Sequence, residues 1–146
     1  MSKRMLSAVL PVALLMAGFA AGRLTSDGAA AHAQAGNRVF ELRTYTTNEG
    51  KLPALQARFR DHTLKFFAKH GMTNIGYWVP QDAPLSQNTL IYVIAHPSRE
   101  AAKKSWDAFR ADPEWVKVRD ESQKDGPLTT KVESVFLNPT DYSPLK

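Results

Sequence analysis

A carboxylate and a guanidinium occur two residues apart in this chain, at Glu41 and Arg43. The residues around them alternate between polar and apolar, which predicts a strand, and residues i and i+2 of a strand point to the same face. A carboxylate beside a guanidinium could hold a polar ligand or position a proton donor. The alternative is an ion pair, within one chain or between two, because buried charges are usually paired for structural reasons.

Three tyrosines could add hydroxyl groups to the same region. Tyr45 follows on the same predicted strand, while Tyr77 and Tyr92 lie in two later stretches that also have the composition of strands. We include all three among the candidate ligand-binding residues. Packing is the alternative role, since tyrosine in a sheet more often packs than reacts.

Histidine is the other candidate for proton or metal chemistry. His62 and His70 are eight residues apart on one predicted helix, which does not match the three- or four-residue spacing of a helical metal site. His62 falls on the apolar stripe of that helix, so we expect it to face the core. His96 ends a predicted strand and joins the candidate ligand-binding residues, with haem or metal ligation as its alternative role. We predict no metal site and assign no cofactor.

Several classes of function have no counterpart in the sequence. The 146 residues include no cysteine, which excludes a cysteine nucleophile, a thiolate metal site and a disulfide framework. No Ser–His–Asp arrangement, glycine-rich phosphate loop or pair of metal-binding carboxylates can be recognised, and no catalytic residue is assigned. The formal charge of +5 is small and dispersed, so we expect no nucleic-acid partner.

The elements that would carry these residues follow from the periodicity of the chain. Residues 38–46 predict a first strand, and residues 52–70 have apolar positions at spacings of three and four, as in an amphipathic helix of about five turns. Residues 73–79 predict a second strand that ends at Pro80. The stretch 89–95 is the most apolar of the chain, so we expect it to be a central strand covered on both faces.

The second half repeats the pattern of helix and strand. Ser98 is placed to cap a helix, and Asp112 with Pro113 begins a second, shorter helix that runs to about residue 124. Residues 131–137 predict a last strand, and an extended tail follows at 139–146. The large aromatic residues of the helices are expected to pack in the core: Trp106, Phe109 and Trp115.

The order strand, helix, strand, strand, helix, strand predicts an α+β fold. Its simplest form is a ferredoxin-like antiparallel sheet with both helices on one face. We assign Glu41, Arg43 and Tyr45 to the other, open face. Because that face is also rich in apolar residues, we expect two copies to cover it by forming a homodimer around an enclosed, sheet-lined space.

The first 33 residues are predicted to be a signal peptide. A basic start is followed by the nearly charge-free stretch 5–22, and Ala31-His32-Ala33 is a small-x-small cleavage site. We therefore expect export, to a periplasm or out of the cell, with a short linker at 34–37 and a folded domain at 38–138. The alternative is a membrane anchor formed by uncleaved residues 5–22.

The stretch from residue 38 to about residue 137 resembles the NIPSNAP family. The similar segments are Phe-Glu-Leu-Arg-Thr-Tyr at 40–45, Gly-Tyr-Trp at 76–78 and, most specifically, Trp-x-x-Phe-x-x-Asp-Pro-Glu-Trp at 106–115. The resemblance implies a dimeric α+β barrel, a superfamily that includes small cofactor-free monooxygenases and haem-binding enzymes. NIPSNAP proteins themselves have no well-established chemistry, so the resemblance implies no particular reaction.

Three functions are therefore expected, in order. The first is an exported homodimer that binds a small ligand or otherwise lacks catalysis, and it comes first because no set of residues requires catalysis. The second is a small cofactor-free monooxygenase-like or haem-handling enzyme. The third is a protein-interaction module at the cell envelope. A visible haem or flavin absorption band in protein from the native host would favour the enzyme.

Overall fold

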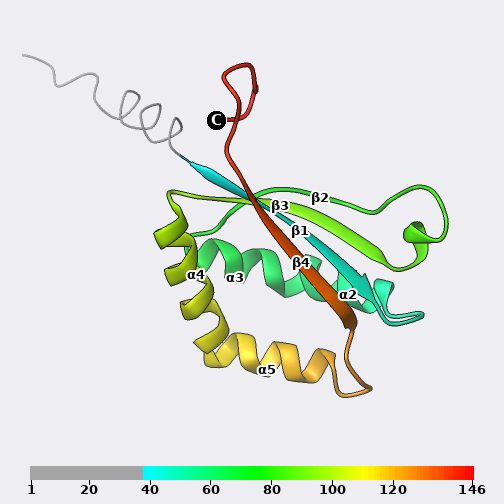
Figure 1. Ribbon diagram of the computed structural model, residues 1–146. Helices are drawn as coiled ribbons and strands as arrows, with labels where there is room; N and C mark the ends of the chain where they lie inside the picture. The colour runs from blue at the N-terminus through cyan, green and yellow to red at the C-terminus, as the bar shows by residue number, and fades with distance from the viewer. Residues whose placement is uncertain (1–37) are drawn as a thin grey trace, which may run out of the picture.

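Four strands form one antiparallel sheet in the computed structural model, which describes residues 38–146 (Figure 1). The sheet order is β2-β3-β1-β4, the ferredoxin-like arrangement that the order of elements predicts. The predicted signal peptide and linker lie outside the described residues. The strands are β1 (Val39–Thr47), β2 (Thr73–Trp78), β3 (Thr89–His96) and β4 (Thr129–Leu137).

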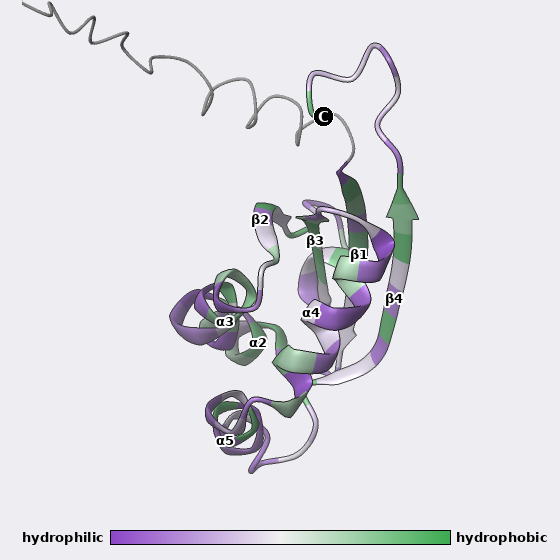
Figure 2. Ribbon diagram, turned by 90° about the vertical axis from the view of Figure 1, so that its left-hand side faces the viewer, coloured by the Kyte–Doolittle hydropathy of each residue, from purple (hydrophilic) through white to green (hydrophobic). Residues whose placement is uncertain are grey.

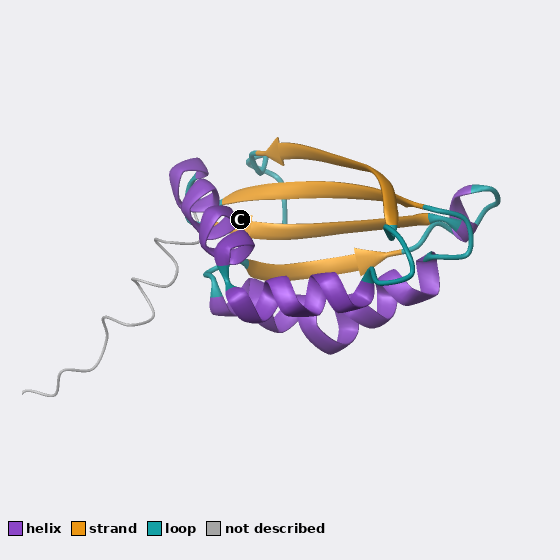
Figure 3. Ribbon diagram, turned by 90° about the horizontal axis from the view of Figure 1, so that it is seen from below, coloured by secondary structure: helices purple, strands orange, loops and turns teal. Residues whose placement is uncertain are grey.

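The helices connect the strands as predicted. A continuous helical stretch joins β1 to β2, a short 3-10 turn (Leu85–Gln87) lies between β2 and β3, and two helices join β3 to β4. Figure 3 shows α2 and α3 running alongside the strands. Within the described range, no helix is long and apolar enough to cross a membrane. The helical elements are α2 (Leu52–Arg58), the π-helix η1 (Phe59–Thr63), α3 (Leu64–Lys69), α4 (Arg99–Ala111) and α5 (Pro113–Ser122).

The core lies between the sheet and the helices. Figure 2 shows β3 mostly in the green of apolar residues, and β3 is a central strand as predicted. The three large aromatic residues predicted for the core are buried there, since Trp106, Phe109 and Trp115 each expose less than a tenth of their surface. Burial of such aromatic side chains supplies much of the stability of a domain of this size.

The π-helix η1 corrects one detail of the predicted first helix. Its inward residues are four apart, at Leu55, Phe59, Thr63 and Phe67. In a regular α-helix each four-residue step overshoots a full turn by about 40°, so three steps would carry the side chains away from the sheet. A π-turn accommodates an extra residue and keeps the stripe aligned. Thr63 is therefore the buried residue, and the expectation that His62 faces the core was wrong, because His62 is exposed.

In the structure, the two faces of β1 are the reverse of the sequence prediction. Glu41, Arg43 and Tyr45 point toward the helices: Glu41 is hydrogen-bonded to Trp106 of α4, and the Tyr45 ring lies 5.8 Å from that of Phe59 in η1. The alternation was right but the choice of face was wrong. A carboxylate can be buried when its charge and hydrogen bonds are matched, and here the helix side supplies the partners.

The open face is apolar and is partly covered by the C-terminal tail. Instead of extending away, the tail turns back, and the guanidinium of Arg38 donates a hydrogen bond of 3.0 Å from Nε to the main-chain oxygen of Lys146. A cavity of about 340 Å³ lies between the tail and the sheet, against Phe40, Val93 and Leu137. Much of the apolar surface nearby is in contact with solvent, including Val135, which is 53% exposed.

Candidate functional site

Glu41 is the centre of a buried polar cluster. The side chain is almost fully buried. Its Oε1 accepts hydrogen bonds from Arg43 Nη1 at 2.6 Å and Ser134 Oγ at 2.6 Å. Its Oε2 accepts one from Trp106 Nε1 at 2.7 Å and lies 3.0 Å from His96 Nε2. Burial would raise the pKa of Glu41, but these four contacts lower it to about 2, so the carboxylate is ionised at neutral pH.

The four partners of Glu41 come from four different elements. Arg43 belongs to β1, His96 to β3, Trp106 to α4 and Ser134 to β4. The cluster therefore joins the sheet to a helix at one end of the molecule. Both oxygens of the carboxylate already have partners within this chain. The geometry therefore matches the alternative interpretation, in which Glu41 and Arg43 form an internal ion pair.

Arg43 is held by an aromatic ring as well as by the carboxylate. Its guanidinium carbon lies 4.3 Å from the centre of the Trp106 ring, a cation–π distance. Burial lowers the pKa of Arg43, but Tyr45, Tyr92 and Glu41 together raise it by more than burial lowers it. The pKa of Arg43 is therefore above its usual value. Among residues 38–146, its buried Nε and the buried Nδ1 of His96 have no hydrogen-bond partner.

The three candidate tyrosines surround Phe59. The rings of Tyr45, Tyr77 and Tyr92 have their centres 5.2 to 5.8 Å from the centre of the Phe59 ring. The Tyr92 hydroxyl donates to the Tyr45 hydroxyl at 3.1 Å, and the Tyr77 hydroxyl donates to Asn74 Oδ1 at 2.5 Å. Burial raises the pKa of Tyr77 and of Tyr92 above the usual range, so both phenols are neutral at neutral pH.

The structure thus brings the six candidate residues together on the helix side of the sheet, in two neighbouring groups. Glu41, Arg43 and His96 form the polar cluster, and the tyrosines form the aromatic group. None of the six faces the open side, where the dimer space was expected. Of the six, Tyr77 lines one of the cavities found in the described part of the chain.

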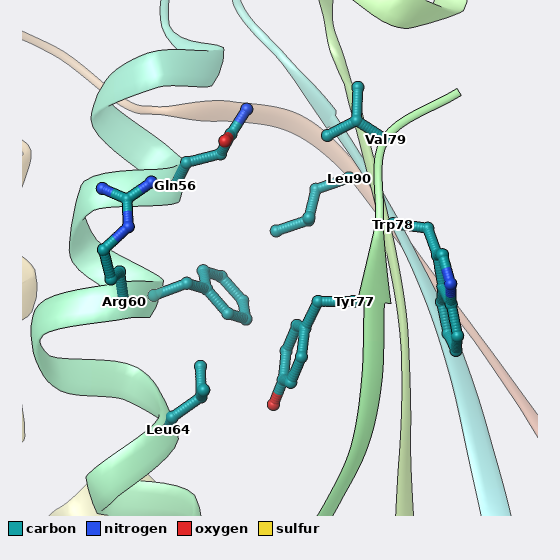
Figure 4. A pocket seen from close by; sticks show the side chains of 8 residues that line it. Gln56, Arg60, Leu64, Tyr77, Trp78, Val79 and Leu90 are labelled. Carbon is teal, nitrogen blue, oxygen red and sulfur yellow. The ribbon is translucent and has the colours of Figure 1, made fainter. Parts of the chain in front are cut away.

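That cavity, which we call the slot, has a volume of about 240 Å³ and lies between the helical stretch and strands β2 and β3 (Figure 4). Phe59, Leu64, Tyr77 and Leu90 give it an apolar interior. Figure 4 shows Gln56 and Arg60 on the helix side, while the Trp78 side chain points away on the far side of its strand. An apolar cavity with a few polar groups at its wall is typical of small-molecule sites.

Sequence reasoning did not identify the helix residues of the slot. Gln56 and Arg60 look like ordinary solvent-facing positions of an amphipathic helix, and Arg60 is exposed. The sequence signal that could have found them is the run of apolar or buried positions four residues apart, which requires a π-turn. Such turns inside α-helices often occur at functional sites. Phe59, Arg60 and Leu64 all line the slot, and they lie in or directly after that turn.

Across residues 38–146, no group of three or more potential ligand side chains could hold a metal ion. His70 instead contacts Asp112 Oδ2 at 2.8 Å, and His96 contacts Glu41. The candidate site therefore consists of the slot and the aromatic group that adjoins it.

Comparison with known proteins gives a family match and several similar folds. A family model described as NIPSNAP matches residues 40–144. The crystal structure of a NIPSNAP family protein of unknown function from Agrobacterium tumefaciens is 23% identical, with a TM-score of 0.66, and the match covers 76% of this chain and 96% of that one. An uncharacterised NIPSNAP-like domain protein from Burkholderia xenovorans is 20% identical, with a TM-score of 0.65 and coverage of 76% and 93%.

A more distant likeness is to an enzyme. A monooxygenase from Streptomyces coelicolor, solved with the ligand nanaomycin D, is 14% identical, with a TM-score of 0.53 and coverage of 78% of this chain and 96% of that one. At this identity the likeness concerns the fold alone. No match is found among curated proteins.

Proposed function

The chain belongs to the NIPSNAP family, and from that premise we propose that it is an exported homodimer that binds a small molecule in the slot. The observation that carries the proposal is the slot itself, a preformed apolar cavity beside a π-turn. The family supplies the fold but no established reaction. The ligand must therefore be inferred from the chemistry of the walls.

The slot suits a small, largely apolar ligand with one polar or anionic group. Its volume of about 240 Å³ is below the range of about 300–1,000 Å³ for typical ligand pockets, so one ring fits better than several. Phe59 and Tyr77 offer aromatic surfaces to such a ring. The Gln56 amide and the Arg60 guanidinium can pair with a carboxylate or carbonyl at the wall.

The open face supports the homodimer. The alternation of the strands places Leu42, Val93 and Val135 on that face, and Val135 and Leu137 are 53% and 40% exposed. Apolar patches of this kind usually mark an interface, and a second copy of the same face is the simplest cover. Export is proposed because the apolar stretch 5–22 and the small-x-small motif at 31–33 have the order of a signal peptide.

The binding proposal can be tested by titrating the purified protein with benzoate and phenylacetate, followed by two-dimensional NMR. We expect shifts at residues of the slot, and we expect Leu64→Trp, which fills the cavity, to abolish them. Leu85→Trp is the matched control, because Leu85 is exposed in the 3-10 turn between β2 and β3 and does not line the slot. Equal binding by the Leu64 variant would overturn the proposal. A product heavier by one oxygen atom would favour the monooxygenase-like alternative.

A further inference from the structure

A second hollow lies on the other side of the same helical stretch, between it and α5. Figure 1 shows α5 below α2 and α3. The hollow, which we call the α5 groove, has a volume of about 750 Å³, and its apolar wall is formed by Ala54, Ala57, Phe66 and Val118. Arg58 and Ser122 also line it. The slot and the α5 groove share no lining residue.

Arg58 is a mostly buried cation without a counterion. Within residues 38–146, no carboxylate lies within salt-bridge distance of it, and its one hydrogen bond runs from Nη1 to Ser122 Oγ at 3.3 Å. Its buried Nε has no partner among the same residues. A charge taken out of water is costly unless it is paired. Burial lowers the pKa of Arg58, although Tyr45 and Tyr92 counteract this.

The guanidinium is nevertheless held in place. Its carbon lies 5.6 Å from the centre of the Trp115 ring, and Ser122, its hydrogen-bond partner, is fixed by donating to the main-chain oxygen of Arg119 at 2.7 Å. A planar guanidinium fixed in this way is preorganised to pair with a carboxylate in the forked geometry.

We propose that the α5 groove binds a monocarboxylate with an apolar body, its carboxylate on Arg58 and its body along the apolar wall. The acidic lining favours a single negative charge over a phosphate or a polyanion, because Asp61, Glu114 and Glu121 also line the groove and oppose a highly charged anion. Glu114 and Glu121 already pair with Lys69 and Lys124. Among residues 38–146, Asp61 forms no salt bridge with Arg58.

The test is calorimetric titration of the purified protein with sodium octanoate and with octanamide, its neutral analogue. We expect octanoate to bind one to one, and octanamide to bind about 10–100-fold more weakly, the factor that corresponds to a charge-assisted hydrogen bond. Arg58→Met should weaken octanoate binding by a similar factor. Arg110→Met is the control, because Arg110 is an exposed arginine of α4 that lines neither the slot nor the α5 groove, and it should leave octanoate binding unchanged.

Each contrary result has a definite meaning. Equal affinity for octanoate and octanamide, or unchanged binding by the Arg58 variant, would overturn the proposal. Loss of octanoate binding in the slot variant Arg60→Met but not in Arg58→Met would place the carboxylate in the slot, and would likewise overturn the proposal. If Arg58→Met fails to fold, Val118→Trp blocks the apolar wall without touching the charge. Unchanged octanoate binding by that variant would be equally decisive against the groove.

Discussion

Glu41 shows how this fold buries a charge. Its carboxylate receives Arg43, Ser134 and Trp106 and contacts His96, all at 3.0 Å or less. Each contact alone contributes modestly to the stability of the fold. Removing one partner, however, leaves the remaining polar groups buried without a full set of hydrogen bonds. The cluster is therefore a structural anchor whose loss affects stability more than binding.

Glu41→Gln is expected to destabilise the protein by about 3–5 kcal/mol at pH 7, the usual effect of breaking a buried charge pair. Denaturant unfolding measures this directly. In the double variant with Arg43→Met, both charges are absent, and we expect a smaller loss than in the single variant. If the single and double variants lose equal stability, the ion pair makes no coupled contribution.

The same carboxylate predicts how stability depends on pH. Its pKa is lowered in the folded protein to about 2, from about 4.3 in an unfolded chain. Its contribution is therefore complete above about pH 5 and is lost as the pH falls toward 2. The free energy of unfolding of Glu41→Gln should vary less over that window than that of the unsubstituted protein. Parallel pH profiles would contradict the assignment.

At the scale of elements, the boundary between α4 and α5 depends on one capping residue. Asp112 Oδ1 accepts the main-chain N–H of Glu114 at 2.9 Å, and Oδ2 contacts Lys69 and His70, both at 2.8 Å. The same side chain thus begins α5 and joins it to the end of α3. The capping role was predictable from the Asp-Pro-Glu sequence, whereas the contacts with α3 were not, because they join positions more than 40 residues apart.

Asp112→Ala is expected to lower the melting temperature by several degrees, because it removes a helix cap and a contact between helices. Asp112→Asn should lower it less, since asparagine also caps helices. Asp107→Ala is a control at an exposed pair with Lys103, where we expect little change. Circular dichroism during heating checks all three. Equal melting temperatures for the alanine and asparagine variants would mean that the cap contributes little.

The elements also show what periodicity can and cannot predict. Alternation of polar and apolar residues predicted the four strands found in residues 38–146, and spacings of three and four predicted the main helices, since these patterns reflect local geometry. The face of β1 was assigned wrongly, because alternation defines two faces without saying which one meets the helices. Whether Glu41 is buried depends on Trp106, His96 and Ser134, which are distant in sequence. The slot was missed for the same reason, as its two walls meet only in the folded chain.

At the scale of the whole molecule, the proposed homodimer depends on the open face. Val135 and Val132 offer a matched test on one strand: Val135 pairs with Leu42 on the open face, and Val132 pairs with Tyr45 on the helix side. Both are exposed, at 53% and 44%. We expect Val135→Asp to produce monomers in light scattering and Val132→Asp to leave dimers intact. A monomer before any substitution would remove the basis of the proposal.

The hydrogen bond between Arg38 and the main chain of Lys146 has a consequence for the topology of the chain. The two ends of the described domain lie one side chain apart, so a short peptide can join them into a closed loop. Residues 81–85 of the β2–β3 connection are exposed, and exposed loops of this kind tolerate new termini. A circularly permuted chain opened there would keep each of the four strands paired with its present neighbours. It would also move the attachment point of any leader to the opposite end of the sheet.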